Sequence, residues 1–225
     1  MDKETDKEKI DACICILEEL YGEPLARQVD TVDLLVMTIL SQNTSDTNSL
    51  RAFGRLKTAY SDYEALLAAP ENELADAIRA GGLAEIKARR IRETLQKIRQ
   101  DAGTITLSFL DGMDGKEAMS YLVSLPGVGP KTASVVLLFS FGKHFMPVDT
   151  HVHRVSRRLG LVPEKASVQK AQEILEKVVP PEKYLSLHLN LIRHGRRICR
   201  ARGAKHAACA LQKWCDYCTR AKSLK

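Results

Sequence analysis

Apolar residues recur along this chain mainly at the spacing of one helix face. Ile10, Ile14 and Leu17 lie one helical turn apart within residues 7–20, which predicts an amphipathic helix there. The segment VDLLVMTILS, which begins at Val32, is apolar almost all round, as a central buried helix would be. The dominant period is therefore helical, and we expect an all-α fold.

Turn and cap signals divide the chain into about ten pieces of helix length. They lie at Tyr21 to Pro24, Ala69 to Asn72, Gly81-Gly82, Asp111-Gly112, Leu125 to Pro130, Pro147, Pro163 and Pro180-Pro181. One stretch departs from the helical period: Leu185, Leu187, Leu189 and Leu191 alternate with polar residues, which taken alone predicts a strand. Neither an internal repeat nor a low-complexity linker marks a domain boundary.

Composition narrows the class of protein. At 225 residues and 44% hydrophobic content, the chain is long enough for one large domain or two small ones. The charged N-terminus MDKETDKEKI has no signal-peptide core, and no apolar run approaches the ~20 residues of a membrane span. We therefore expect a cytoplasmic, nucleoid-associated protein. A net charge of +6 and a pI near 9.0 favour an anionic partner such as a phosphate backbone, although many basic proteins bind no nucleic acid.

The segment LPGVGPKTA predicts a DNA-gripping hairpin. Gly127 and Gly129 permit a tight turn with outward amides, and Pro130 suits the first position of a new helix. Val128 would fill the space between the two helices while the glycine amides meet a DNA phosphate without regard to base. An ordinary helix–turn–helix connection is the alternative, because Gly-x-Gly alone is a weak signal.

Two residues near this hairpin are candidates for chemistry. Lys131 falls in the first turn of the second helix, where the helix dipole and partial desolvation disfavour the ammonium form. A lysine that loses its proton can be a nucleophile. Asp149 fits the N-cap of the next helix, and its carboxylate could also stabilise positive charge at a reacting sugar and help move a proton. Surface solvation and simple capping are the respective alternatives.

LPGVGPKTASVVL followed by FMPVDTHVHRVSRRLGL resembles the helix–hairpin–helix, Gly/Pro…Asp motif of the endonuclease III family of DNA glycosylases. The resemblance runs from about Ile10 to Cys215. It implies two all-helical domains flanking a DNA cleft, residues 32–142 with the hairpin and residues 1–31 plus 143–225 with a cysteine cluster. It also implies helix rather than strand for the alternating leucines.

The same resemblance implies a reaction. Lys131 would attack C1′ of a flipped nucleotide, expel the base, form a Schiff base and nick the strand by β-elimination, with Asp149 as the essential carboxylate. The expected substrate is double-stranded DNA with an oxidised or damaged pyrimidine or an abasic site, bound by a monomer. Two alternatives stay open: a glycosylase of the superfamily with another damaged-base or mismatch substrate, and a non-catalytic helix–hairpin–helix DNA-binding module. Lys131 with Asp149 argues against the second, since binding alone requires neither.

Other segments match the family less tightly. Asn43, or its neighbour Gln42, resembles the polar residue that fills the gap left by a flipped base, and Leu83 resembles the apolar wedge in the opposite strand. A polar helix end and a glycine-capped turn are the ordinary alternatives. Thr150 and His151, which follow Asp149, are further candidates for contact with DNA, and a structural histidine is an equal alternative.

Cysteines are concentrated near the C-terminus. In the reducing compartment expected for this protein, such a group favours a metal or iron–sulfur centre over disulfides. The resemblance implies a [4Fe–4S] cluster, with Cys199, Cys209 and Cys215 at the first, third and fourth family positions and His206 at the second. Cys218 is an extra cysteine. We favour Cys218 over His206 as the fourth ligand, because cubane clusters are normally held by four thiolates. A zinc site would accept either set, and a lost cluster is a further alternative. Basic residues around these ligands would present a positive face to DNA, so we expect the centre to have a structural rather than a redox role. These residues are Arg193, Arg196, Arg197, Arg200, Arg202 and Lys205.

Overall fold

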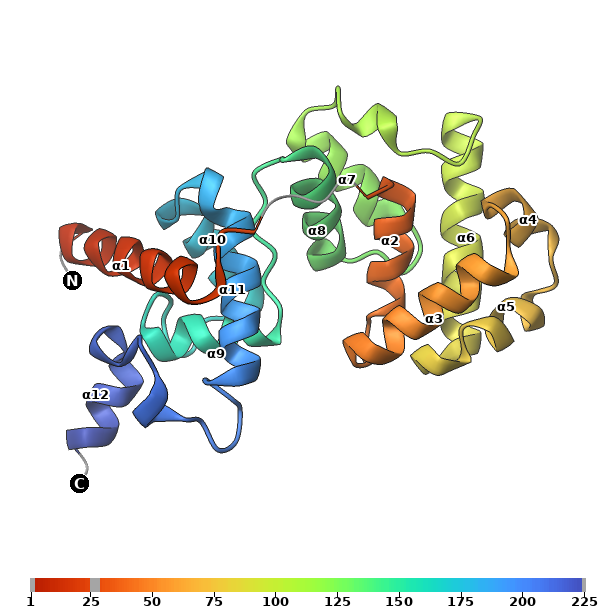
Figure 1. The fold of residues 1–225 in the computed structure, drawn as a ribbon. Helices are drawn as coiled ribbons and strands as arrows, with labels where there is room; N and C mark the ends of the chain where they lie inside the picture. Colours follow the sequence, from red (N-terminus) through yellow and green to blue (C-terminus); the bar gives the residue numbers. More distant parts are fainter. Residues whose placement is uncertain (1–2, 25–28, 224–225) are drawn as a thin grey trace. The chain divides into compact units, whose positions relative to one another are not determined.

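The computed structural model describes residues 3–24 and 29–223, with side chains for 7–24 and 29–220. Every regular element in these ranges is a helix, which confirms the expected all-α class. None of the described helices is long and apolar enough to cross a membrane. The chain divides into two compact units, residues 27–143 and residues 1–26 with 144–225 (Figure 1).

The unit of residues 27–143 is continuous in sequence. Its helices are α2 (Thr31–Leu40), α3 (Asp46–Ala59), α4 (Tyr63–Ala68), α5 (Glu71–Ala77), α6 (Ala84–Ala102), α7 (Gly115–Ser124) and α8 (Pro130–Phe141), with the short 3₁₀ helices η1 (Arg79–Gly81) and η2 (Ser108–Leu110).

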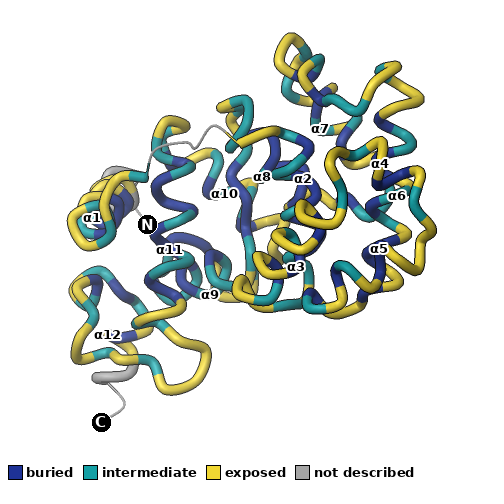
Figure 2. The backbone as a smooth tube through the Cα atoms, turned by 45° about the vertical axis from the view of Figure 1, so that its right-hand side comes forward, coloured by how far each residue is buried: buried dark blue, intermediate teal, exposed yellow. Residues whose placement is uncertain are grey.

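Helix α2 is the centre of this unit. Asp30 caps it by accepting a hydrogen bond from the Asp33 amide at 2.9 Å, which satisfies one of the free N–H groups at the helix start. Leu35, Val36 and Ile39 are fully buried, and the helix contacts α3, α6 and α8 (Figure 2). The prediction of a central buried helix from Val32 is confirmed.

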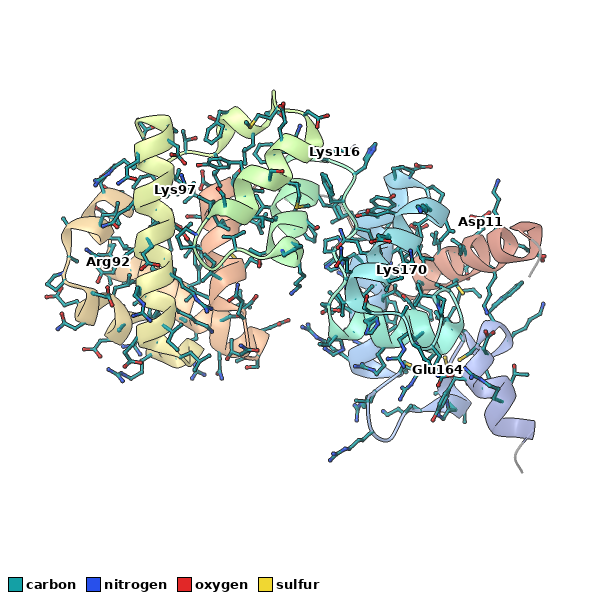
Figure 3. All side chains as sticks on the ribbon, turned by 180° about the vertical axis from the view of Figure 1, so that it is seen from behind. Asp11, Arg92, Lys97, Lys116, Glu164 and Lys170 are labelled. Carbon is teal, nitrogen blue, oxygen red and sulfur yellow. The ribbon has the colours of Figure 1, made fainter. Side chains whose placement is uncertain are left out.

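Helix α6 packs one face into the same core. The buried positions of α6 share the period of a single helix face: Ala84, Lys87, Ala88, Ile91, Thr94, Leu95 and Ile98. The opposite face carries charged residues such as Lys97, which Figure 3 labels. The helix ends at Gly103, whose positive φ of 77° suits a residue without a side chain.

The other unit joins the two ends of the chain. It contains α1 (Lys3–Tyr21), α9 (Thr150–Leu159), α10 (Val168–Val178), α11 (Tyr184–Arg197) and α12 (Asp216–Ser223), with the 3₁₀ helices η3 (Pro181–Lys183), η4 (His206–Ala208) and η5 (Gln212–Trp214). Helix α11 contacts both α1 and α9, and α12 contacts α9. Glu18 of α1 receives hydrogen bonds from Lys183 at 3.1 Å and Ser186 at 2.6 Å, so polar contacts reinforce this packing.

The alternating leucines belong to helix α11, so the strand pattern is misleading there. It misleads because polar residues of this segment are also buried, each with a hydrogen-bond partner. His188 Nδ1 lies 2.8 Å from the Pro147 carbonyl, and Asn190 donates to the Gly22 carbonyl at 3.0 Å. Polar groups can be buried when they are hydrogen-bonded. The strand prediction assumes that polar side chains face solvent, and that assumption fails in this segment.

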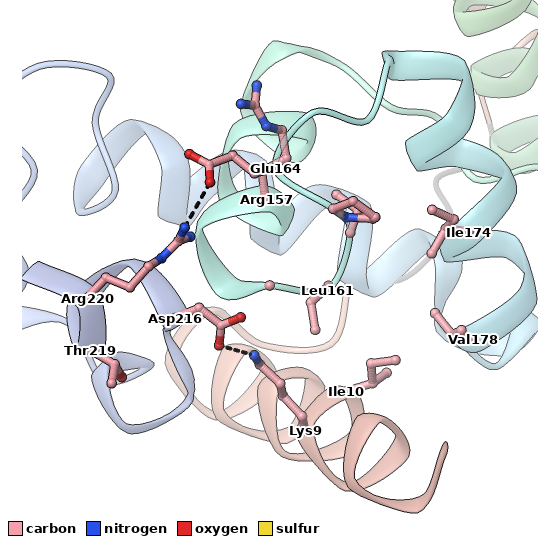
Figure 4. A pocket seen from close by; sticks show the side chains of 13 residues that line it. Lys9, Ile10, Arg157, Leu161, Glu164, Ile174, Val178, Asp216, Thr219 and Arg220 are labelled. Carbon is pink, nitrogen blue, oxygen red and sulfur yellow. Dashed lines mark hydrogen bonds and ion pairs between the residues drawn. The ribbon is translucent and has the colours of Figure 1, made fainter. Parts of the chain in front are cut away.

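Helix α12 docks on α1 through a single ion pair. Lys9 Nζ lies 2.6 Å from Asp216 Oδ1 at the rim of a cavity of about 770 Å³ (Figure 4). Leu161, Ile174 and Val178 provide apolar lining to this cavity, and Arg220 pairs with Glu164 at 2.8 Å beside it. Ion pairs thus contribute to the docking of α12, together with its contact with α9 and the burial of Cys218.

Candidate active site and DNA-binding residues

The predicted hairpin joins α7 to α8 and closes tightly. The Val128 amide donates to the Leu125 carbonyl at 3.1 Å, and Val128 itself is only 5% exposed. Gly127 has φ +74°, and a β-carbon there would lie 2.7 Å from Arg90 Cδ, so no other residue fits this position without movement. Pro130 occupies the first turn of α8, as predicted.

The hairpin leads directly into the N-terminus of α8, where no side chain caps the helix. Gly129 is the N-cap of α8 but provides no side-chain cap, which leaves the first amides of the helix without an internal partner. Such amides, together with the positive end of the helix dipole, form a binding site for an anion. The geometry therefore suits a phosphate at Gly127 to Gly129.

Lys131 is the first side chain with a charge after this anion site. It lies in the first turn of α8 and is exposed, whereas Thr132, Ala133 and Ser134 behind it are buried. The partial desolvation expected of Lys131 stays a prediction, and its exposed position shows that it is not a core residue. The amine is accessible to a bound substrate.

Asp149 caps α9, as predicted. Its Oδ1 accepts hydrogen bonds from the His151 amide at 2.8 Å and the Val152 amide at 2.7 Å. Both cap bonds go to the same carboxylate oxygen. Buried Val148 precedes the aspartate, and Thr150, which follows it, is exposed. Lys131 and Asp149 belong to different units of the chain.

Arg154 fixes the candidate residue His151 and connects α9 to the cysteine loop. Its Nη2 lies 3.1 Å from His151 Nδ1 and donates to the Gly195 carbonyl at 2.9 Å. Its Nε donates to the Cys199 carbonyl at 3.1 Å. This arginine is not predictable from the sequence, because nothing in a chain with many basic residues marks one that binds carbonyls distant along the chain.

The two candidate DNA-penetrating segments share an uncommon backbone. Among the described residues, Asn43 with φ 53° and Leu83 with φ 51° are the only ones other than glycine at positive φ. This left-handed conformation is costly for a leucine, and strain of this kind gathers at functional sites. Leu83 is also 52% exposed, although it is a large apolar residue.

Gln42 and Asn43 differ in what their side chains do. Gln42 Nε2 donates to the Gly127 carbonyl at 3.1 Å, and its Oε1 receives a bond from Arg90 at 3.4 Å. Asn43 is exposed. The side chain of Gln42 is thus bonded to the hairpin, whereas Asn43 is the residue of the pair that is exposed to solvent.

The four C-terminal cysteines and His206 line one small cavity. Cys218 Sγ lies 3.3 Å from His206 Nδ1, so both candidates for the fourth ligand position lie at the same place. Arg158 donates to Cys199 Sγ at 3.3 Å, and Cys215 Sγ donates to the Arg158 carbonyl at 3.2 Å. Burial, with a smaller contribution from the neighbouring Cys215, raises the pKa of Cys218 to about 12. None of the cysteines in the described part of the chain forms a disulfide.

Comparison with known proteins places this chain in a family. The model described as HhH-GPD superfamily base excision DNA repair protein matches residues 36–181. Endonuclease III of Thermotoga maritima is 32% identical over 210 residues, which are 90% of this chain and 93% of that protein. The chain belongs to the HhH-GPD superfamily, as an endonuclease III-like DNA glycosylase.

Two further comparisons support this assignment of the glycosylase. A relative from Arabidopsis thaliana is 39% identical over 165 residues, which are 73% of this chain and 56% of the plant protein. A solved structure of a trapped covalent endonuclease III–DNA intermediate matches with a TM-score of 0.83 at 29% identity, and covers 96% of this chain and 98% of that chain. The expected resemblance to endonuclease III is confirmed.

The donor set of the glycosylase suits a thiolate-bound centre. Four thiols and one imidazole around one cavity are the soft ligands that iron–sulfur clusters and zinc prefer. In the described residues, no three His, Cys, Asp or Glu side chains are arranged to hold a single metal ion. The chemistry of these residues and their shared cavity are therefore compatible with a thiolate-bound centre.

The basic face around these cysteines is largely as expected. Arg196, Arg200, Arg202 and Lys205 of the glycosylase are exposed. Arg193 is an exception, because its Nη1 donates to the Tyr21 carbonyl at 2.7 Å and so caps the C-terminal end of α1. Arg193 therefore has a structural contact within its own unit.

Proposed function

We propose that this protein is a bifunctional DNA glycosylase and abasic-site lyase that removes oxidised or damaged pyrimidines in base excision repair. The observation that carries the proposal is the exposed Lys131 amine in the first turn of α8, directly after an anion-binding hairpin. A phosphate bound at the hairpin amides would bring the sugar–phosphate chain next to this amine. The pyrimidine preference rests on the family resemblance.

The reaction proceeds by covalent catalysis at the sugar. Lys131 Nζ, as the free amine, attacks C1′; the glycosidic bond breaks, and its electron pair leaves with the base, which takes up a proton. The sugar ring opens to a Schiff base between Nζ and C1′. Loss of a proton from C2′ then breaks the bond between C3′ and its oxygen, the phosphate leaves and the strand is nicked. Water releases the lysine.

Asp149 serves this reaction with its carboxylate. We assign to it the stabilisation of positive charge on the sugar and the transfer of a proton. Its two cap bonds hold the carboxylate in a fixed orientation at the start of α9, which is favourable because charge stabilisation depends on preorganised groups.

The remaining site residues bind and distort the duplex. Gly127, Val128 and Gly129 hold a phosphate, Asn43 fills the space of the extruded nucleotide, and Leu83 wedges the opposite strand. We assign Gln42 to support of the hairpin rather than to the gap, and its bond to the Gly127 carbonyl favours this assignment. Thr150 and His151 contact the DNA backbone beside Asp149.

We also propose a [4Fe–4S] cluster held by Cys199, Cys209, Cys215 and Cys218. The role of these ligands would be structural: held by them, the cluster would cross-link the C-terminal loop that carries the exposed arginines. The contact between Cys218 and His206 makes the imidazole a neighbour of the ligand set.

Borohydride trapping on DNA with an abasic site tests the proposed function. Lys131→Gln should abolish the covalent adduct and strand nicking and keep duplex affinity within about threefold, because the hairpin amides remain. Lys116→Gln, an exposed lysine of the same unit that Figure 3 labels, is the matched control and should trap normally. An adduct in Lys131→Gln would exclude this lysine as the nucleophile. Base excision without trapping in the unaltered protein would indicate a glycosylase without lyase activity, and binding alone a non-catalytic module.

A further inference from the structure

Lys87 is a buried lysine with an unusual pair of partners. Its residue is only 1% exposed, and burial lowers its pKa. A buried ammonium group is costly unless it is bonded. Lys87 Nζ donates to the Leu40 carbonyl at 2.7 Å and to the Gly81 carbonyl at 2.8 Å. The two backbone carbonyls therefore provide the hydrogen bonds that allow this donor to be buried in the core.

These two carbonyls end the elements that lead to the two strained turns. Leu40 is the last residue of α2, and the turn that follows contains Asn43. Gly81 is the last residue of η1, and the turn that follows contains Leu83. One ammonium group thus joins the starts of both segments. A cation at the C-terminal end of α2 also meets the negative end of its dipole.

The same face of α6 continues to the hairpin. One turn after Lys87, Arg90 packs its side chain against Gly127 and donates to Gln42 Oε1 at 3.4 Å. The next buried polar residue, Thr94, donates to the Pro126 carbonyl at 2.7 Å. A single row of polar side chains on α6 therefore holds all three segments of this unit that we assign to DNA.

We propose that Lys87 is a positioning residue that locks the Asn43 turn to the Leu83 turn, so that the two side chains enter the duplex as one rigid unit. This inference rests on the proposed function. Two left-handed turns that were free to relax would lose their strained geometry, and filling of the gap would then no longer coincide with wedging of the opposite strand. A misplacement of about 1 Å can lower a rate about a hundredfold.

Lys87→Met tests the proposal, since methionine keeps the apolar stem and removes the donor. Excision of a damaged base from fully paired duplex should fall about ten- to a hundredfold. Trapping on a single-stranded abasic oligonucleotide, which needs no base extrusion, should change less than about threefold. Lys97→Met is the matched control, because Lys97 lies on the exposed face of α6 and pairs only with Asp101 at 2.9 Å. It should leave both assays unchanged.

A double-mutant comparison separates positioning from general stability. If Lys87 acts through the wedge, the double variant Lys87→Met, Leu83→Ala should excise no more slowly than the slower single variant. Both substitutions would abolish the same step, the insertion of Leu83 into the opposite strand. Equal loss in the paired and single-stranded assays, or multiplicative effects in the double variant, would overturn the proposal. If Lys87→Met does not fold, Lys87→Arg replaces it, and its selective loss on paired duplex is the supporting result. Failure of the unaltered protein to trap would instead count against the proposed function.

Discussion

At the scale of single residues, Asp149 combines a structural and a chemical task on one carboxylate. Its Oδ1 receives both cap bonds of α9. An amide or hydroxyl oxygen can accept the same bonds, whereas only the carboxylate carries charge. The two tasks are therefore separable by substitution.

We expect Asp149→Asn and Asp149→Ser to keep the melting temperature near that of the unaltered protein but to slow base excision by at least about a hundredfold. Asp149→Ala should be equally slow and also lose ~1 kcal/mol of stability with the cap. Single-turnover excision and thermal unfolding measure the two effects. Excision at the normal rate by Asp149→Asn would leave the residue with capping alone.

The site residues that the sequence predicts are those whose chemistry is local. Pro130 at a helix start and Asp149 at a cap depend only on their nearest neighbours along the chain, so composition and spacing reveal them. Lys87 and Arg154 each bind at least one carbonyl far away in sequence, and a lysine or arginine on a helix is ordinarily solvated. A signal for Lys87 exists: it shares the helical face of Ala84, Ala88 and Ile91, where a charge is out of place.

At the scale of elements, Gly160 governs how α12 docks. It ends α9 at φ +83°, and a β-carbon there would lie 1.9 Å from Asp216 Oδ2 and 2.9 Å from Lys9 Nζ. A side chain at this position would therefore displace the ion pair that connects α1 to α12.

Gly160→Ala should destabilise the protein by about 2–3 kcal/mol, through left-handed strain of roughly 1–2 kcal/mol plus the lost contact. Gly142→Ala is the control, because Gly142 ends α8 at φ +61° with nothing within 4 Å of an added β-carbon. It should show the strain alone. Chemical denaturation measures both, and equal losses would mean that the Lys9–Asp216 pair adds nothing.

The cysteine loop gives a second prediction at this scale. Cys218→Ser should lose iron and loosen the C-terminal loop, since metal binding and folding are coupled. His206→Ala should keep iron, because cubane clusters normally take four thiolates. Iron and zinc content of anaerobically prepared protein is the measurement. The reverse pattern would assign the imidazole as the ligand, and zinc without iron would replace the cluster assignment.

The elements themselves were largely legible in the sequence, with one instructive exception. The helix at Val32 and the turn signals follow from local propensity and period. The alternating leucines of α11 alone predict a strand, and only the family resemblance implies the helix that the structure contains. The alternation misleads because Ser186, His188 and Asn190 are buried through bonds to residues distant in sequence. Periodicity assumes that polar residues face water, and it fails where tertiary contacts satisfy them.

At the scale of the whole molecule, charge should dominate the grip on undamaged DNA. The chain carries a net charge of +6, and exposed basic residues surround the cysteine loop. Binding that releases counterions weakens linearly on a log–log plot of affinity against salt. We expect duplex affinity to fall about tenfold or more between ~50 and ~200 mM salt, measured by fluorescence anisotropy. A flat titration would contradict electrostatic binding.

The division of one unit between the two ends of the chain has a consequence for biosynthesis. Helix α1 precedes residues 27–143 in the chain, whereas α11 and α12, which it contacts, follow them. Residues 27–143 form a compact unit in between, so they can fold on the ribosome while α1 waits. At ~5–20 residues per second, that wait lasts on the order of ten seconds. During it, Ile10, Ile14 and Leu17 lack the helices that bury them in the folded protein, so we expect this apolar stripe to be exposed in the nascent chain until α11 has been synthesised.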